Sequence, residues 1–154
     1  MVNTQDGITL LCHGPGAWRL RLKPDGIQQL QGLFDANSFW AQGRSPKSLK
    51  RMLHCSQAAV SAWKGGKLIG FGRATSDGLF RAVLWDVVVA ESHQGKGLGR
   101  RMVNNLLQTP ALRQVERIYL MTTNSADFYG QLGFETVGSQ QLMLRQNPQA
   151  TGSL

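Results

Sequence analysis

Residues 79–109 read LFRAVLWDVVVAESHQGKGLGRRMVNNLLQT, and they predict a buried strand, a glycine-rich turn and a helix. Residues 83–89 form a β-branched and aromatic run with almost no polar interruption, which is typical of a buried strand. The apolar residues after the turn recur at helical spacing and predict an amphipathic helix. They are Leu98, Met102, Leu106 and Leu107.

The turn at residues 94–99 has the sequence QGKGLG, with three glycines in five positions. Glycines let backbone N–H groups approach an anion closely, and the N-terminus of the following helix adds partial positive charge. Lys96, Arg100 and Arg101 add full cationic charges. The turn is therefore predicted to cradle a pyrophosphate.

Three other interpretations of this turn compete with a pyrophosphate cradle. A Walker A loop requires G-x-x-x-x-G-K-[ST], which the turn does not contain. A dinucleotide fingerprint would need Gly or Ala where Arg100 or Met102 stands, and it would open a βαβ unit rather than lie in mid-chain. A glycine-rich loop that merely turns the chain is the structural alternative.

The chain has 154 residues, enough for one α/β domain with its own core and too few for two. We expect this domain at residues 17–145, between a flexible lead-in at residues 1–16 and a flexible tail at residues 146–154. No apolar run approaches the roughly 20 residues that a membrane helix needs. The N-terminus lacks a basic segment followed by a long apolar core, so no secretory signal is predicted.

Further strands and helices are predicted by alternation, helical spacing and turn signals. The Gly65-Gly66 pair predicts a hairpin, and Ser45-Pro46 predicts a helix start. Strands are expected at residues 18–22, 58–63, 68–75, 117–121, 135–137 and 142–144. Helices are expected from about residue 26 to 37, after residue 45, and at residues 125–132.

The pattern Q-x-x-G-x-G at residues 94–99, after three valines, resembles the acetyl-CoA-binding motif of the GNAT superfamily of N-acetyltransferases. Residues 67–78 (KLIGFGRATSDG) and 84–89 (LWDVVV) narrow the resemblance to the plastid and cyanobacterial branch. That branch includes plant-type serotonin N-acetyltransferases, some also described as protein lysine and N-terminal acetyltransferases. The resemblance covers roughly residues 17–144. It implies a single-domain α/β fold with a mixed, mostly antiparallel sheet, splayed at the central strand and flanked by helices.

The resemblance also implies the residues of the site. Trp85 and Asp86 would line the acceptor side, and Tyr129 would be the general acid. The residues that would hold acetyl-CoA are Val88, Val89, Gln94, Gly95, Lys96, Gly97, Leu98, Gly99 and Arg100. The amine would attack the thioester directly in a ternary complex, so neither cysteine needs a role.

Residues 126–134 (ADFYGQLGF) resemble the GNAT signature of a Tyr on a short helix followed by x-x-L-G-F. A phenol with a pKa near 10 can protonate the departing thiolate, whose thiol has a pKa near 8.5. A core aromatic with a hydrogen-bonded hydroxyl is the structural alternative for Tyr129. Thr122 stands where many GNATs carry an Asn that holds pantetheine, and the carboxylate of plant members is absent from this strand end. Asn124 is expected to take over part of the polar role, including cofactor contact.

A general base is needed because an alkylamine with a pKa near 10.4 arrives mostly protonated. Asp86 is the first candidate, since burial among Trp and Val side chains should raise its pKa. The equally weighted alternative is a structural Asp86 held by backbone or by Arg73 or Arg81. His93 is the second candidate for the base, and a water chain is the third.

The remaining His and Cys residues are not assigned to the site. His13 and His54 are interpreted as incidental, and three dispersed His with two Cys form no metal-ligand pattern. Cys12 and Cys55 are expected to be free thiols in a reducing compartment.

We therefore expect an acetyl-CoA-dependent N-acetyltransferase that acts on a primary amine. Trp85 favours an arylalkylamine such as serotonin, because an indole can stack there; a protein lysine or N-terminal amine is the alternative. The net charge of +8 is partly explained by the phosphates of coenzyme A. A nucleic-acid-binding module is disfavoured, because the basic residues are dispersed and no recognition motif occurs. A homodimer is left open, no membrane partner is expected, and the expected location is the cytoplasm, or the plastid stroma for a plastid-encoded chain.

Overall fold

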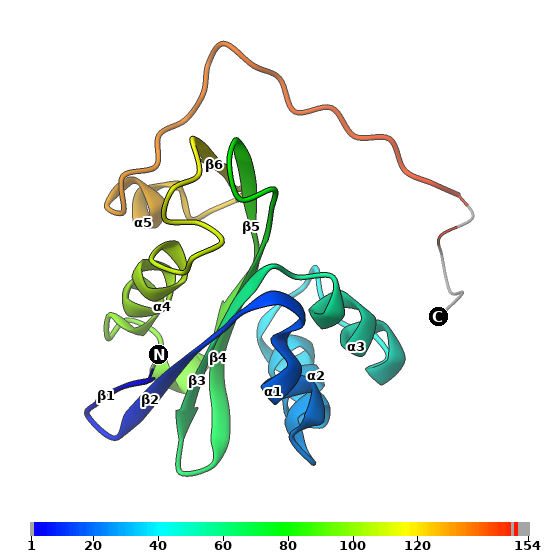
Figure 1. Cartoon of the computed structure of the whole chain (residues 1–154), viewed down its shortest axis with the longest axis vertical. Coiled ribbons are helices and arrows are strands. Elements are labelled where there is room, and N and C mark those ends of the chain that lie inside the picture. The colour runs from blue at the N-terminus through cyan, green and yellow to red at the C-terminus, as the bar shows by residue number, and fades with distance from the viewer. Residues whose placement is uncertain (1, 149, 151–154) are drawn as a thin grey trace. The chain divides into compact units, whose positions relative to one another are not determined.

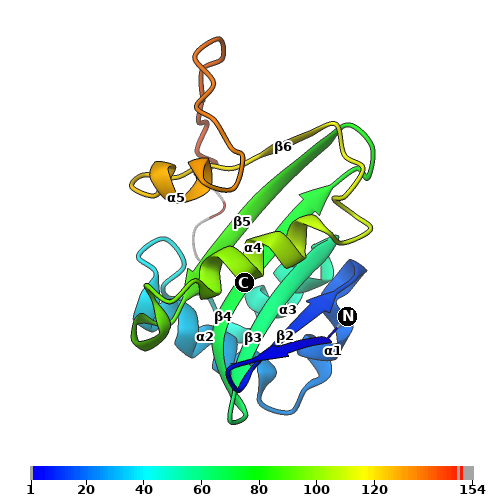
Figure 2. The ribbon, with the colours of Figure 1, turned by 90° about the vertical axis from the view of Figure 1, so that its left-hand side faces the viewer.

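The computed structural model describes residues 2–148 and residue 150. The chain divides into two compact units, Met1–Leu120 and Met121–Leu154. The first unit is built on a six-stranded sheet in the order β1-β2-β3-β4-β5-β6 (Figures 1 and 2). Neighbouring strands are antiparallel from β1 to β5, and β5 and β6 are parallel. The strands are β1 (Val2–Gln5), β2 (Ile8–His13), β3 (Ala58–Lys64), β4 (Lys67–Ser76), β5 (Arg81–Val89) and β6 (Arg117–Tyr119).

Helices cover both faces of this sheet, as Figure 1 shows edge-on. One face carries α1 (Trp18–Leu22), α2 (Gly26–Asn37) and α3 (Pro46–His54), and the other carries α4 (Leu98–Leu107). The predicted start of α3 is confirmed: Pro46 is its first residue, and the Ser45 Oγ accepts a hydrogen bond from the Ser48 N–H at 3.1 Å. The mixed, helix-flanked sheet predicted from the sequence is therefore confirmed.

The core of the first unit lies mainly between the sheet and the three-helix layer. Phe34 of α2 packs edge-to-face on Phe71 of β4, with ring centroids 5.6 Å apart, and both side chains are fully buried. On the other face, α4 lies close to β4 over Gly70, where an added Cβ would be 2.5 Å from the Met102 Sδ. Glycine in mid-strand therefore permits the close approach of α4 to the sheet.

Residues 2–13 form a β-hairpin, contrary to the loose lead-in expected there. Strands β1 and β2 pair antiparallel, from Val2 opposite Leu11 to Gln5 opposite Ile8. The two-residue loop between them is Asp6-Gly7, and both residues have positive φ, at 54° and 72°. Asp-Gly is a strong signal for such a hairpin, so the sequence contained the information that the prediction overlooked.

Residues 18–22 were predicted as a strand, and this is wrong: they form helix α1. The prediction relied on apolar residues in alternation, which should bury Trp18, Leu20 and Leu22 together. Only Leu20 is buried, whereas Trp18 and Leu22 are 56% and 73% exposed. Lys23 is extended and ends the helix, as expected for a residue before proline.

The second unit contains the helix α5 (Ala126–Gly130), within the predicted range of 125–132. The closing strands expected at residues 135–137 and 142–144 are absent from the described part of this unit. Leu142, Met143 and Leu144 are consecutive and 77–87% exposed, so they do not present the one apolar face on which a half-buried strand depends. Among the described residues of the whole chain, no helix has the length and apolar character needed to span a membrane.

Candidate active site

The glycine-rich turn joins β5 to α4 through a short 3₁₀ helix at Glu91–His93. Gly95 and Gly97 have φ values of +74° and +80°, a region that L side chains rarely adopt. Gly97 is the N-cap of α4 and has no side chain that could cover the helix end. The first amides of a helix lack intrahelical acceptors, so those of Leu98 and Gly99 are suited to bind an anion.

Two side chains of the turn tie it to the residues just before it. The Gln94 Nε2 donates to the Val89 carbonyl at 2.8 Å, and the Lys96 Nζ lies 3.5 Å from the Ser92 carbonyl. Gln94 therefore stabilises the return of the chain from the end of β5. Lys96 and Arg100 are exposed and add positive charge beside the turn.

The central strand β5 loses its parallel partner before it reaches the turn. Its pairing with β6 runs only from Arg81 opposite Arg117 to Val83 opposite Tyr119. From there to Val89, no described residue pairs with that side of β5. The Val88 side chain is 3% exposed and belongs to the core, so only the backbone of Val88 is available at this edge.

A β-bulge at Asp86 interrupts the pairing of β5 with β4. Arg73 is opposite Trp85 and Phe71 is opposite Val88, so Asp86 and Val87 together face Gly72. Asp86 has a φ of 54°, in the left-handed region. A bulge of this kind changes the direction of a side chain, and here it turns Asp86 toward the loop between α2 and α3.

The Asp86 carboxylate is buried in a cluster of donors. Its Oδ2 lies 2.8 Å from the Arg73 Nε and 3.1 Å from the Arg44 Nη1, and its Oδ1 accepts from the Trp40 Nε1 at 3.1 Å. The Asp86 side chain is only 4% exposed. Three donors from β4 and the α2–α3 loop thus satisfy one carboxylate.

The expected rise in the pKa of Asp86 is wrong. Burial raises this pKa, but the hydrogen bonds and positive charges of Arg44 and Arg73 outweigh the burial and lower it below its ordinary value. The alternative pairing of Asp86 with Arg73 is confirmed, whereas Arg81 lies 3.7 Å from Glu116 instead. A carboxylate held in its ionised form by two guanidinium groups is a weak base.

We expect Asp86→Asn to lower the free energy of unfolding at pH 7 by about 2 kcal/mol, because Arg73 and Arg44 lose their counter-charge. The native pKa of Asp86 lies below that of the unfolded chain. Its stabilisation is therefore complete above about pH 4 and is lost as the pH falls through the lower native value. Urea unfolding from pH 7 down to pH 3 should show the gap between wild type and variant narrowing below about pH 4. The control is Asp127→Asn at an exposed position; a gap independent of pH would contradict the ion-pair interpretation.

Aromatic side chains surround the Asp86 cluster. The Trp85 Nε1 donates to the Thr75 Oγ1 at 2.8 Å, and the Arg73 guanidinium lies 5.9 Å from the Trp85 ring centroid. Phe39 and Trp40 contact each other edge-to-face with centroids 5.1 Å apart, and they are 69% and 48% exposed. Exposed rings beside a polar cluster form a surface that can receive an apolar group.

Phe39, Trp40 and Arg44 belong to this cluster but were not predicted from the sequence. Two adjacent aromatics between predicted helices were a usable signal, because loops often carry binding residues. Their contact with Asp86 could not be found from the sequence, since it depends on how the α2–α3 loop packs on β5.

Tyr129 and Asn124 lie in the second unit. Tyr129 is on α5, with ring centroids 4.9 Å from Phe128 and 5.8 Å from Phe134. Burial raises the pKa of its phenol, so the group keeps its proton at neutral pH. Asn124 is exposed, and its Oδ1 accepts from the Ser125 hydroxyl at 3.3 Å, while the Thr122 hydroxyl accepts from the Ser125 N–H at 3.0 Å.

His93, the second candidate for the base, ends the 3₁₀ helix between β5 and the glycine turn. Its Nδ1 lies 2.9 Å from the Ser92 Oγ, and its side chain is half-buried. His13 is buried in the core, and its Nε2 lies 2.8 Å from the Ser61 Oγ. Burial lowers the pKa of His13 to about 4, so it is neutral and fits its incidental interpretation.

Residues 27–134 match the family model described as Acetyltransferase (GNAT) family. The structure is similar to that of a GNAT-family acetyltransferase from Streptococcus pneumoniae, with a TM-score of 0.72 and 20% identity. That match covers 92% of this chain and 98% of the other, and it concerns the fold.

Three curated relatives show the range of names among similar sequences. "Uncharacterized N-acetyltransferase ycf52" of Pyropia yezoensis is 42% identical over 70% of this chain and 64% of that protein. "Histone acetyltransferase TAP1" of Glycine max is 43% identical over 45% of this chain and 28% of that protein. "Serotonin N-acetyltransferase 2, chloroplastic" of Oryza sativa is 36% identical over 59% of this chain and 48% of that protein. The matches thus span less than two thirds of these relatives.

Proposed function

The chain belongs to the acetyltransferase (GNAT) family, and we propose that it transfers the acetyl group of acetyl-CoA to the amine of an arylalkylamine such as serotonin. The choice of an aromatic acceptor rests on the exposed Phe39–Trp40 pair. The Trp40 indole of this pair donates to Asp86, which is next to Trp85 in the sequence. Together these rings would hold the aromatic end of such an amine. The rice relative is named a serotonin N-acetyltransferase, and this name supports an arylalkylamine acceptor.

The glycine turn is proposed to hold the phosphates of acetyl-CoA. The positive φ of Gly95 and Gly97 and the uncapped start of α4 support this assignment. The unpaired edge of β5 up to Val89 would offer backbone groups to the pantetheine arm. The proposed cofactor contacts are Val88, Val89, residues 94–99, Arg100, Asn124 and Tyr129. Acetyl-CoA supplies the thioester, and the amine attacks it directly.

The roles of the polar residues follow from their surroundings. Tyr129 is proposed to protonate the departing thiolate, because its phenol is protonated at neutral pH. Asp86 is proposed as a positioning residue that holds Trp40, Arg44 and Arg73 in place, since its lowered pKa makes it a weak base. The base is then His93 or a water chain.

We expect the acidic limb of the kcat/KM profile to persist in Asp86→Asn. If Asp86 only positions Trp40, the apparent pKa of the limb stays the same while KM for the amine rises. His93→Gln tests the other side-chain candidate and should remove the acidic limb if His93 is the base. Disappearance of the acidic limb in Asp86→Asn would identify Asp86 as the general base.

We expect Phe39→Ala to lower kcat/KM about tenfold for serotonin and tryptamine and less than about twofold for spermidine. Phe39 is 69% exposed and makes its ring contact with Trp40, so the substitution removes the proposed acceptor surface without opening the core. Phe80→Ala is the matched control, because Phe80 is 59% exposed and immediately precedes β5, outside the proposed acceptor surface. Acetylation rates for these amines and a lysine peptide should be measured side by side.

A protein amine is the second candidate acceptor, because the soybean relative is named a histone acetyltransferase. The structure offers one observation on this point: α3 carries the exposed side chains of Lys47, Lys50 and Arg51 and no acidic residue. A lysine peptide with acidic neighbours should then be acetylated faster than a basic one. A faster reaction with either peptide than with serotonin would overturn the arylalkylamine assignment.

A further inference from the structure

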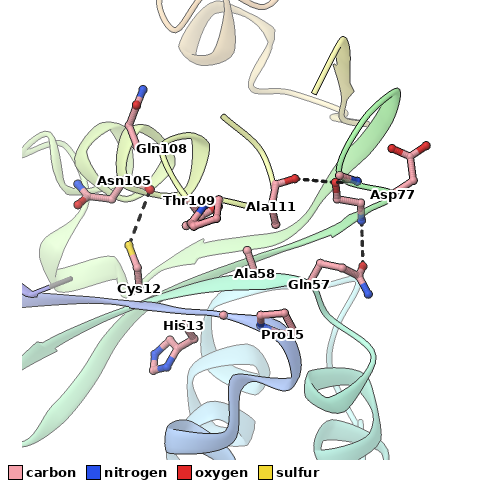
Figure 3. Close-up of a pocket in the computed structure, with 14 residues that line it drawn as sticks. Cys12, His13, Pro15, Gln57, Ala58, Asp77, Asn105, Gln108, Thr109 and Ala111 are labelled. Atoms are coloured by element: carbon pink, nitrogen blue, oxygen red, sulfur yellow. Dashed lines mark hydrogen bonds between the residues drawn. The ribbon is translucent and has the colours of Figure 1, made fainter. Parts of the chain in front are cut away.

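A cavity lies in the first unit, near the C-terminal end of α4 and the adjoining ends of β2, β3 and β4 (Figure 3). Its volume is about 560 Å³, within the range of small-molecule sites. Its lining includes Cys12, Pro15, Ala58, Asn105, Thr109 and Ala111. The glycine turn begins α4, so the cavity and the proposed phosphate site lie at opposite ends of this helix.

Small side chains create this space. Gly14 and Ala58 lie on the sheet side, and Ala111 follows α4 on the opposite wall, as Figure 3 shows for the two alanines. A helix normally packs against a sheet through larger side chains that interdigitate. Glycine and alanine at these positions leave the layers in place but do not fill the space between them.

The described lining of the cavity contains no cationic side chain and one carboxylate. None of the described residues that form it is a Lys or an Arg, and its carboxylate is that of Asp77. The Asp77 Oδ1 already accepts from the amides of Leu79, Phe80 and Arg81 at 2.7–3.1 Å. Those bonds lower the pKa of Asp77. An organic anion would find no counter-charge here, and the Oδ1 of the Asp77 carboxylate is already occupied by three backbone amides.

The polar atoms of the wall are also satisfied. The Thr109 hydroxyl donates to the Leu106 carbonyl at 2.6 Å, and the Ser76 hydroxyl donates to the Ala111 carbonyl at 2.7 Å. The Gln57 Oε1 accepts from the Ser76 N–H at 2.9 Å. His13 also borders the cavity, but Figure 3 shows its ring directed away from Thr109 and Ala111. The wall therefore offers apolar contact with few open hydrogen-bonding groups.

We propose that this cavity is a binding site for a neutral, flat and mainly apolar small molecule, separate from the acetyl-acceptor site. The ligand would lie against Ala111, with Cys12 at its side. Cys12 is half-buried, and its Sγ lies 3.7 Å from the Asn105 carbonyl. The thiol provides a local reporter of occupancy. This proposal does not depend on the identity of the acetyl acceptor.

Indole is a suitable probe, because it is neutral and flat. At millimolar indole, we expect alkylation of Cys12 by iodoacetamide to slow about tenfold, as a ligand covering the thiol would require. Cys55 is exposed and is not part of the lining, so its alkylation rate should stay the same. Peptide mass spectrometry of one sample reports both thiols. Equal rates at Cys12 with and without indole would overturn the proposal.

Two variants locate the bound probe. Ala111→Phe places a ring in the cavity, whereas Ala36→Phe adds the same ring on the exposed side of α2. Indole should raise Tm by about 2 °C in wild type and in Ala36→Phe, and the rise should be at least halved in Ala111→Phe, where only the proposed acceptor surface can still bind it. A rise in Tm that is as large in Ala111→Phe as in Ala36→Phe would place indole elsewhere and overturn the proposal. If Ala111→Phe does not fold, the alkylation of wild-type Cys12 decides the question.

The class of ligand is tested with a charged analogue. Indole-2-carboxylate has the same ring system with one negative charge, and it should protect Cys12 at least about tenfold less well, because no cation lines the cavity to offset the buried charge. Equal protection by the two compounds would overturn the restriction to neutral ligands.

Discussion

Replacement of Gly97 by Asp is expected to weaken acetyl-CoA binding at least about 10²-fold, because a carboxylate would stand where the proposed phosphates bind. Gly97 has a φ of +80° and no atom within 4 Å of an added Cβ. Space is therefore not limiting there, and the effect should come from charge and backbone strain. Gly99→Asp should act in the same direction, since Gly99 lies in the first turn of α4. Isothermal titration calorimetry with acetyl-CoA measures both.

Gly97→Asn separates charge from strain. Asn has nearly the same shape as Asp and tolerates the left-handed backbone as well, so the pair differs mainly by one negative charge. We expect Asn to cost less than about tenfold in affinity, and the gap between Asp and Asn to shrink at high salt. Wild-type affinity in Gly97→Asp and Gly99→Asp would show that acetyl-CoA phosphates do not bind at this turn.

Replacement of Tyr129 by Phe is expected to lower kcat about 10²-fold while acetyl-CoA affinity changes little. The substitution removes only the hydroxyl and keeps the ring that packs against Phe128 and Phe134. The proposed loss is that of the proton donor for the CoA thiolate. Steady-state kinetics combined with calorimetry distinguishes this result from a general loss of binding.

The chain contains two tyrosines, so Tyr119→Phe provides a matched control. Tyr119 lies in β6, where its backbone pairs with Val83, and it should tolerate the loss of its hydroxyl with less than about a twofold change in kcat. Near wild-type kcat in Tyr129→Phe would assign Tyr129 a structural role. A Tm that falls in parallel with kcat would lead to the same conclusion.

Several predictions that relied on local pattern agree with the structure, whereas the strand predicted from alternation at residues 18–22 does not. Strand β5, the glycine turn and α4 follow one another as residues 79–109 predicted, and the Gly65-Gly66 hairpin joins β3 to β4. These elements depend on neighbours in the sequence: helical spacing, a β-branched run and glycines at positive φ. The Asp6-Gly7 hairpin was equally local, and its signal was overlooked.

The sequence by itself thus determined the succession of strand, turn and helix, the family resemblance and the position of the glycine turn. The tertiary structure decided the state of Asp86. Its sequence neighbours are apolar and suggested a raised pKa, whereas Arg44 and Arg73 reach it from the α2–α3 loop and from β4 and lower it. The tertiary structure likewise created the cavity beside Ala58 and Ala111. A charge cluster and a void both depend on which distant segments meet in space, and local periodicity does not contain that information.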